Sequence, residues 1–257
     1  MSLEALKTKY DLNIIGKETV TSTNTELIEM AKNGAKEGTV LIATEQTAGK
    51  GRTGKSFYSP KGSGLYISIL LRPDFKPDDA LYLTTIAAVA TAKAIESVSD
   101  KEAKIKWVND VYIDKKKVCG ILTESVLNPE GDKLDYAVVG IGINLCPPEG
   151  GFPKEIKNIA TTVFDENCDS NERKDLTNAL LDFFMDYYEN FENNSHLEEY
   201  INHSCILGDM ITYNKGNVKY KAKAIDIDSK CRLKIEDENG NTSLLSYGEV
   251  SIDIPNE

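Results

Sequence analysis

Residues 49–56 read GKGRTGKS, and this segment limits the folds open to the chain more than any other feature. Its letters fit the phosphate-binding pattern G-x-x-x-x-G-K-[ST] of P-loop NTPases, where a helix follows at once and points its N-terminus at the phosphates. Here Pro60, Gly62 and Gly64 follow closely, and they prevent a helix of useful length. A P-loop NTPase is therefore a weak alternative, and residues 47–64 are predicted to form a loop.

Four cationic side chains gather in this loop although the chain as a whole is acidic. They are Lys50, Arg52, Lys55 and Lys61, and the net charge of the 257 residues is −11. Glycines let backbone N–H groups approach an anion closely, and cations neutralise it. Composition alone leaves two interpretations open, a phosphate-binding loop or a mobile, solvated one. The negative net charge argues against a general nucleic-acid-binding surface.

The composition is that of a folded chain, with 40% hydrophobic and 28% charged residues. It allows one large domain, or a domain with a small appendage. The longest apolar stretches, such as 86–92, are far shorter than the roughly 20 residues that span a bilayer. The N-terminus has no signal-peptide core. These features predict a protein of the cytoplasm with no membrane partner.

Cysteine and histidine are too few and too scattered for several common kinds of site. The five cysteines are odd in number and include no C-x-x-C pair, which disfavours a disulfide framework and a zinc site. The two histidines, His196 and His203, fall in an acidic helical stretch and are interpreted as surface residues. A hydrolase triad, which needs a histidine beside its nucleophile, is disfavoured for the same reason.

Hydrophobic periodicity predicts an α+β arrangement followed by short strands. Strands are expected at 12–21, 39–44, 65–72, 104–108, 111–113, 117–126 and 136–145, and helices at 23–34, 78–98 and 175–190. The first helix is expected to begin with a capping box of Thr23 and Glu26 and to end at Gly34. After residue 206 short alternating segments are typical of a small β-barrel. We therefore predict two domains, 1–205 and 206–257.

A second group of candidate residues lies in KWVND (106–110) and KVCGIL (117–122). The carboxylate of Asp110, at a predicted strand end, could bind a ribose hydroxyl, a metal-bound phosphate or a cation. Lys117 stands in an apolar strand, an unfavourable place for a charge unless an anion pairs with it. Alternatively, Asp110 caps a turn and Lys117 extends its ammonium to solvent. These residues alone leave the two interpretations open.

Taken in order, these motifs resemble those of the biotin–protein ligase family. The matching segments, which cover most of the chain, are STN (22–24), QTAGKGRTGK (46–55), LYIS (65–68), KWVND (106–110), KVCGIL (117–122), VGIGINL (139–145) and SYGEVSI (246–252). Each motif is weak alone, but together and in register they are specific. Lys50 stands where the family usually has Arg, which keeps the charge but loses the bidentate geometry.

The resemblance implies a fold and an activity. The expected fold is α+β, a mixed sheet with flanking helices like that of class II aminoacyl-tRNA synthetases, plus a C-terminal Src-homology-3-like barrel. The expected reaction joins biotin to a lysine of a biotin carboxyl carrier protein through biotinyl-5′-AMP, with biotin, ATP and Mg²⁺. A lipoate–protein ligase is the nearest alternative. The short stretch before the first motif is expected to mark the form without an N-terminal DNA-binding domain, and a homodimer is possible.

The resemblance also assigns roles to residues. The expected catalytic residues are Lys117, Arg52 and Asp110. Those expected at biotin are Ser22, Thr23, Asn24, Gln46, Lys50, Gly51, Arg52, Lys117 and Gly120. Those expected at ATP or the adenylate are Lys50, Arg52, Lys55, Phe57, Asn109, Asp110, Lys117 and Asn144, with no structural metal site. Gly120, Gly140 and Gly142 are expected to leave room for the bicyclic ring.

Overall fold

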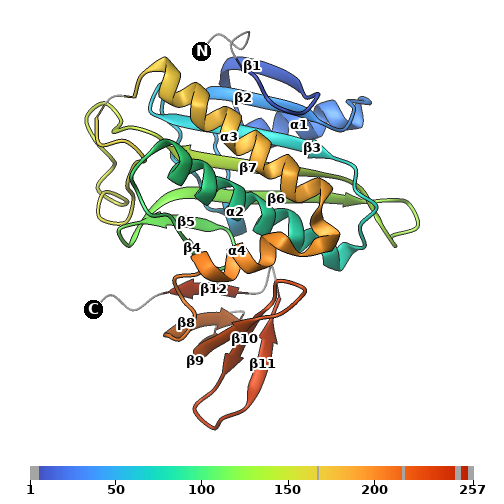
Figure 1. Ribbon diagram of the computed structural model, residues 1–257, viewed down its shortest axis with the longest axis vertical. Helices are drawn as coiled ribbons and strands as arrows, with labels where there is room; N and C mark the ends of the chain where they lie inside the picture. The colour runs from blue at the N-terminus through green and yellow to red at the C-terminus, as the bar shows by residue number, and fades with distance from the viewer. Residues whose placement is uncertain (1–5, 167, 216–217, 247–249, 254–257) are drawn as a thin grey trace.

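A seven-stranded sheet in the order β1-β2-β3-β7-β6-β5-β4 forms the centre of the larger part of the molecule (Figure 1). Its strands are β1 (Asn13–Val20), β2 (Thr39–Gln46), β3 (Gly64–Leu71), β4 (Lys104–Lys106), β5 (Asp110–Ile113), β6 (Lys116–Leu127) and β7 (Leu134–Asn144). Only β1 and β2 run parallel, and the other neighbours are antiparallel. The computed structural model describes residues 6–166, 168–215, 218–246 and 250–253.

Helices cover the two faces of this sheet unequally. On one face lie α2 (Ala80–Val98), α3 (Ser170–Glu189) and α4 (Ser195–His203), and on the other lies α1 (Thr23–Lys32) (Figure 1). The segment Pro77–Val98 is long and apolar enough to cross a membrane, but 72% of its most apolar 18-residue stretch is buried inside the protein. Since α2 is apolar nearly all round, it fits the core between the sheet and α3. The single helix α1 leaves part of its face open for a site.

The helix starts differ from the predicted ones in a way that hydrogen bonding explains. The N-cap of α1 is Ser22, without a side-chain cap, so the predicted Thr23–Glu26 capping box is wrong. The Glu26 carboxylate instead lies 2.6 Å from Lys17 Nζ. A capping box is found at α3, where Asp169 accepts from Asn171 N and Glu172 N. This cap lets α3 begin five residues before the predicted start.

Five antiparallel strands form the C-terminal unit, in the order β11-β10-β9-β8-β12. They are β8 (Met210–Lys215), β9 (Val218–Ile227), β10 (Leu233–Glu236), β11 (Thr242–Leu245) and β12 (Val250–Asp253). The predicted fold class is confirmed, since a mixed sheet with helices is followed by a small antiparallel unit. The domain boundary at 205/206 stays a prediction, and residues 247–249 of the terminal motif lie outside the described residues.

The turn after β9 fastens this unit to the sheet domain. Trp107 Nε1 donates to Cys231 O at 3.0 Å, and the Thr85 hydroxyl donates to Cys231 Sγ at 3.3 Å. Tyr82 adds a bond from its hydroxyl to Ser229 O at 3.0 Å. Hence the only tryptophan of the chain serves the contact between the two sheets.

All five cysteines are free thiols, which agrees with the predicted lack of a disulfide framework. Two of them nevertheless touch, since Cys146 Sγ and Cys168 Sγ lie 2.6 Å apart. Burial, together with the neighbouring Cys146, raises the pKa of Cys168 to about 12. This thiol therefore stays protonated at neutral pH and is a poor nucleophile.

The interpretation of both histidines as surface residues is wrong for His196, whose exposed fraction is 0%. Its Nε2 lies 3.7 Å from Cys231 Sγ, and its ring packs edge-on against Tyr82. Among the described residues its Nδ1 has no hydrogen-bond partner. The second histidine, His203, is partly exposed, and its Nε2 lies 3.2 Å from Glu96 Oε2. Hydrophobic helix periodicity could not reveal His196, because its buried contact comes from the distant turn at Cys231.

We expect His196 to make the protein sensitive to acid. Burial lowers the pKa of His196 from 6.5 to about 4, so below pH 6.5 the unfolded chain takes up a proton that the folded chain refuses. The free energy of unfolding should fall by about 3 kcal/mol between pH 6.5 and 4, and this contribution is fully present above pH 6.5.

Urea unfolding at pH 7 and pH 4.5 measures this effect. The His196→Gln variant should lose less stability between the two pH values than the parent, by about 2–3 kcal/mol. Carboxylates titrate in both proteins and cancel in the comparison. Equal losses in the two proteins would contradict the assignment.

Candidate functional site

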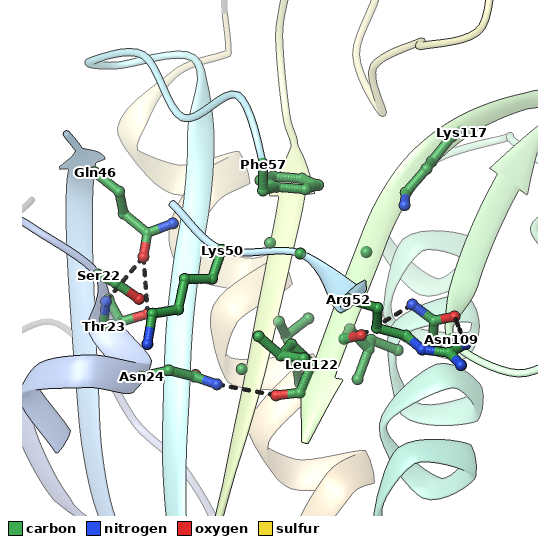
Figure 2. Close-up of a pocket in the computed structure, with 16 residues that line it drawn as sticks. Ser22, Thr23, Asn24, Gln46, Lys50, Arg52, Phe57, Asn109, Lys117 and Leu122 are labelled. Atoms are coloured by element: carbon green, nitrogen blue, oxygen red, sulfur yellow. Dashed lines mark hydrogen bonds between the residues drawn. The ribbon is translucent and has the colours of Figure 1, made fainter. Parts of the chain in front are cut away.

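A cleft opens on the α1 face of the sheet, between the start of α1, the loop after β2 and the middle of β6 and β7 (Figure 2). Its lining residues are Ser22, Thr23, Asn24, Gln46, Lys50, Gly51, Arg52, Phe57, Asn109, Lys117, Gly120, Ile121, Leu122, Gly140, Ile141 and Gly142. These residues come from five of the sequence motifs, so the fold brings the predicted site together.

Two rows of paired residues across the sheet form the floor of the cleft. In one row Tyr66 of β3 pairs with Gly142 of β7, which pairs with Gly120 of β6. Gly120 in turn pairs with Asp110 of β5. In the other row Ser68 pairs with Gly140, which pairs with Leu122. Gly120 and Gly142 are therefore neighbours across the sheet, and the floor of the cleft has no side chains at these positions.

The space above two of these glycines is occupied by the protein itself. A Cβ atom on Gly140 would lie 2.1 Å from Asn24 Oδ1, and one on Gly142 would lie 2.6 Å from the Phe57 ring. The expectation that these glycines make room for a bicyclic ring stays a prediction, since in this arrangement Asn24 and Phe57 take up the space. The glycines make room for Asn24 and Phe57, which then border the ligand space.

A bulge in β6 explains how Lys117 reaches the cleft. Val111 pairs with Cys119, but Tyr112 pairs with Lys117, so Val118 is an extra residue in β6. Side chains normally alternate between faces along a strand, and one extra residue reverses the alternation. Consequently Lys117 Nζ comes within 3.1 Å of the position that a Cβ on Gly120 would take.

One end of the cleft is cationic. Lys117 Nζ donates to Asp110 Oδ1 at 2.7 Å, and Arg52 Nη1 donates to Asn109 Oδ1 at 2.9 Å. The Asn109 amide also donates to Asp110 Oδ1 at 3.1 Å. The Lys117 side chain is 33% exposed, so it is not the buried ammonium that an apolar strand suggested. Lys117 and Arg52 thus lie at the same end of the cleft, held by Asp110 and Asn109, and their charges favour an incoming anion.

The opposite end consists mainly of uncharged polar groups (Figure 2). Gln46 Oε1 accepts from Thr23 N at 2.8 Å, and Gln46 Nε2 donates to Ser59 Oγ at 3.0 Å. The side chain of Lys50 extends toward this end, and its Nζ lies 3.7 Å from Glu124 Oε1. This end suits an uncharged ligand group with several hydrogen-bonding atoms.

The polar atoms of Asn24 are bonded to the protein. Its Nδ2 donates to Leu122 O at 3.0 Å and to Glu124 Oε2 at 2.9 Å, and its Oδ1 accepts from Ser68 Oγ at 2.6 Å. Asn24 thus joins α1, β6 and β3 rather than presenting free donors to a ligand. Its predicted contact with biotin stays a prediction, and the bonds observed here give it a clear structural task.

Three predicted nucleotide contacts lie outside the cleft lining: Lys55, Asp110 and Asn144. Asp110 is next to the lining and reaches it through Lys117 and Asn109. Lys55 is exposed on the loop, and Asn144 donates from Nδ2 to Thr161 O at 3.1 Å. Sequence reasoning assigned no role to Ser68, Leu122 or Glu124. The signal for Ser68 was a small polar residue in the otherwise apolar strand GLYISILL.

The cleft is nearly filled. The cavity between its side chains measures about 50 Å³, whereas pockets for small organic ligands measure roughly 300–1,000 Å³. Phe57 and the cationic side chains of the loop therefore have to move outward when a ligand of that size enters. Among the described residues no group of three His, Cys, Asp or Glu side chains could hold a metal ion.

Comparison with known proteins agrees with this geometry. The model of the Biotin/lipoate A/B protein ligase family matches residues 16–144. The chain belongs to this family. The family resemblance stated from the motifs is thus confirmed, and the matched range includes every residue that lines the cleft.

Individual relatives extend the match beyond the family range. The bifunctional ligase/repressor BirA of Bacillus spizizenii is 31% identical over 237 residues, covering 91% of this chain and 72% of the relative. The biotin–[acetyl-CoA-carboxylase] ligase of Mycobacterium tuberculosis is 30% identical, covering 89% and 85%. Biotin protein ligase from Aquifex aeolicus, solved with biotin and ATP, superposes with a TM-score of 0.79 at 31% identity, covering 94% of this chain and 98% of that one.

We expect Gly140→Ala to destabilise the protein more than Gly142→Ala. The added methyl of Gly140→Ala collides with the buried Asn24 amide, and its three hydrogen bonds are lost or distorted. The expected loss is about 2–4 kcal/mol, a drop in Tm of about 5–10 °C. In Gly142→Ala the methyl meets Phe57, a loop side chain that can swing away, so the loss should stay below about 1.5 kcal/mol. Thermal unfolding of both variants measures the contrast, and equal drops in Tm would contradict it.

Proposed function

We propose that the protein is an ATP-dependent biotin–protein ligase. The observation that carries the proposal is the division of the cleft into an end made mainly of uncharged polar groups and an end that holds Lys117 and Arg52. Biotin has a polar, uncharged ureido head and an anionic carboxylate tail, so the two ends match it. Lipoate has no hydrogen-bonding head group, which makes a lipoate–protein ligase the weaker alternative.

The reaction has two steps. A carboxylate oxygen of biotin attacks the α-phosphorus of ATP, the bond to the bridging oxygen of the β-phosphate breaks, and pyrophosphate leaves. The uncharged amine of a carrier lysine then attacks the acyl carbon of biotinyl-5′-AMP, AMP leaves, and the amine gives up a proton. Magnesium arrives with ATP as part of the substrate, since it favours phosphate oxygens and water as ligands.

The cationic end offsets the electrostatic repulsion between the two anions that react in the first step. Two anions 4 Å apart repel each other by about 4 kcal/mol at an intermediate dielectric constant. Lys117 and Arg52 are assigned to lie between the biotin carboxylate and the α-phosphate and to offset this repulsion. Asp110 orients Lys117 before the ligands arrive, because it holds the ammonium at 2.7 Å.

The partner is assigned as a biotin carboxyl carrier domain of a biotin-dependent carboxylase. The relative from Mycobacterium tuberculosis carries the name of acetyl-CoA carboxylase as its target. A homodimer and a cytoplasmic location remain predictions of the family resemblance and of the sequence composition.

Titration calorimetry tests the proposal as a whole. Biotin should bind, ATP should tighten its binding, and lipoate should give no heat at the same concentrations. Tight binding of lipoate with none of biotin would overturn the assignment.

We expect Lys117→Ala to abolish the first step. Removal of the ammonium leaves the repulsion between carboxylate and phosphate uncompensated, so biotin-dependent ATP–pyrophosphate exchange should fall by about 10²–10³-fold. Lys116→Ala, the exposed neighbour on β6, is the matched control and should keep normal exchange. Near-normal exchange in Lys117→Ala would remove Lys117 from the mechanism.

We expect Arg52→Gly to release the adenylate early. The variant loses the bond from Arg52 to Asn109 and the cation that retains the phosphate. Biotin should then appear on bystander proteins such as serum albumin, detected with labelled streptavidin. Thr53→Gly, an exposed neighbour in the same loop, controls for added loop flexibility and should label only the carrier. Slow release in Arg52→Gly would show that Arg52 does not retain the intermediate.

A further inference from the structure

One carboxylate joins three parts of the cleft that are far apart in the sequence. Glu124 of β6 accepts from Asn24 Nδ2 of α1 at 2.9 Å through Oε2. Its other oxygen, Oε1, lies 3.7 Å from Nζ of Lys50 in the loop after β2. Glu124 itself lies outside the cleft lining, so its effect on a ligand has to pass through these two residues.

The hydrogen bond that Asn24 donates to Glu124 fixes the orientation of the Asn24 amide. A carboxamide has two N–H hydrogens and one oxygen, and in Asn24 both hydrogens go to acceptors, Leu122 O and Glu124 Oε2. The oxygen receives the hydroxyl of Ser68. A flipped amide would place its oxygen against two acceptors. Because Asn24 is 3% exposed and Ser68 is 0% exposed, water cannot compensate for such a flip.

A fixed Asn24 in turn fixes the start of α1. Ser22 and Thr23 precede it directly, and Thr23 N already donates to Gln46. Ser68 Oγ also lies 2.8 Å from Thr23 Oγ1, so the same hydrogen-bond chain extends from Glu124 to the polar end of the cleft. A shift of Asn24 would therefore move the groups assigned to the ligand head.

The second contact of Glu124 directs a cation to the polar end. Lys50 extends toward Asn24, while Arg52, two residues later, turns toward Asn109 at the opposite end (Figure 2). Attraction to the Glu124 carboxylate accounts for this division of the loop cations. The pair is partly exposed, with 45% of the Lys50 side chain accessible, so the charge contact is the weaker of the two.

We propose that Glu124 is a positioning residue that holds Asn24 and Lys50 in place for the head group of biotin. The inference rests on the proposed function and adds a residue to it. Glu124 contacts neither substrate; it sets the affinity for biotin while leaving the nucleotide end, with Asn109, Asp110 and Lys117, unaffected.

Two substitutions at position 124 separate its contacts. Glu124→Gln keeps an oxygen for Asn24 and removes the charge facing Lys50, so the KM for biotin should rise about threefold. Glu124→Leu removes both contacts, and the KM for biotin should rise tenfold or more. In both variants the KM for ATP and kcat of the exchange reaction should stay within twofold of the parent. Glu130→Gln, an exposed carboxylate in the turn between β6 and β7, is the matched control.

A polarity exchange tests the bond to Asn24 directly. Asn24→Asp places a carboxylate against Glu124 and should raise the KM for biotin by far more than Glu124→Gln does. In the double variant Asn24→Asp with Glu124→Gln, the amide of Gln can donate to Asp, so the KM should fall below that of Asn24→Asp. It should stay above that of the parent, because Asp has no donor for Leu122 O. A role limited to folding would change Tm, kcat and both KM values together.

The outcomes distinguish this inference from the proposed function. If the parent protein shows no biotin-dependent exchange, the function itself is wrong. If the parent is active but Glu124→Leu leaves the KM for biotin unchanged, or raises the KM for ATP equally, Glu124 has no positioning role. Failure of the double variant to improve on Asn24→Asp would likewise overturn the proposal.

Discussion

The site depends on the lack of side chains at Gly140 and Gly142. These residues lie in the middle of β7, with β3 on one side and β6 on the other. Any Cβ there would occupy the positions of Asn24 and Phe57, so neither α1 nor the loop after β2 could approach the sheet as closely. The glycines therefore act through the segments that they admit, and the cleft exists between those segments.

Charge is distributed along the cleft against the trend of the whole molecule. The chain carries a net charge of −11, but Arg52 and Lys117 lie together at one end of the cleft, beside Asn109 and Asp110. Each of these cations is held by a hydrogen bond to a neighbouring side chain. Lys117 stands on β6 and not on the loop, so its charge is preorganised, and preorganised charge is the largest source of transition-state stabilisation in many enzymes.

Sequence reasoning predicted the parts of the fold that have a strong local signal. The strands flanking the loop and the long helix α2 followed from their apolar patterns. The turn at Asp114 and Lys115, both at positive φ, falls in the gap between the strands predicted at 111–113 and 117–126. The motifs in order identified the family and most of the cleft lining. These features were predictable because each is determined by residues close together in the sequence or by motifs with a recognisable spacing.

The features that were missed depend on tertiary contacts or on local irregularity. The bulge at Val118 turns Lys117 toward the cleft. The bulged residue is a valine, which is typical of a regular strand, so the sequence does not indicate a bulge there. The burial of His196 arises from the turn at Cys231, and the cap of α1 differs because Glu26 is paired with Lys17. In each case a partner distant in the sequence or an unpaired residue overrides the local pattern.

The tight filling of the cleft links this electrostatic arrangement to motion. Phe57 covers Gly142 and lies near Gly120, so it occupies the space between the polar and the cationic end. A ligand that reaches both ends has to displace this ring, and Phe57 shares its loop with Lys50 and Arg52. Displacement of the ring and placement of the two cations at a ligand therefore involve one segment of the chain, so a movement of this loop changes both the space in the cleft and the charge beside it.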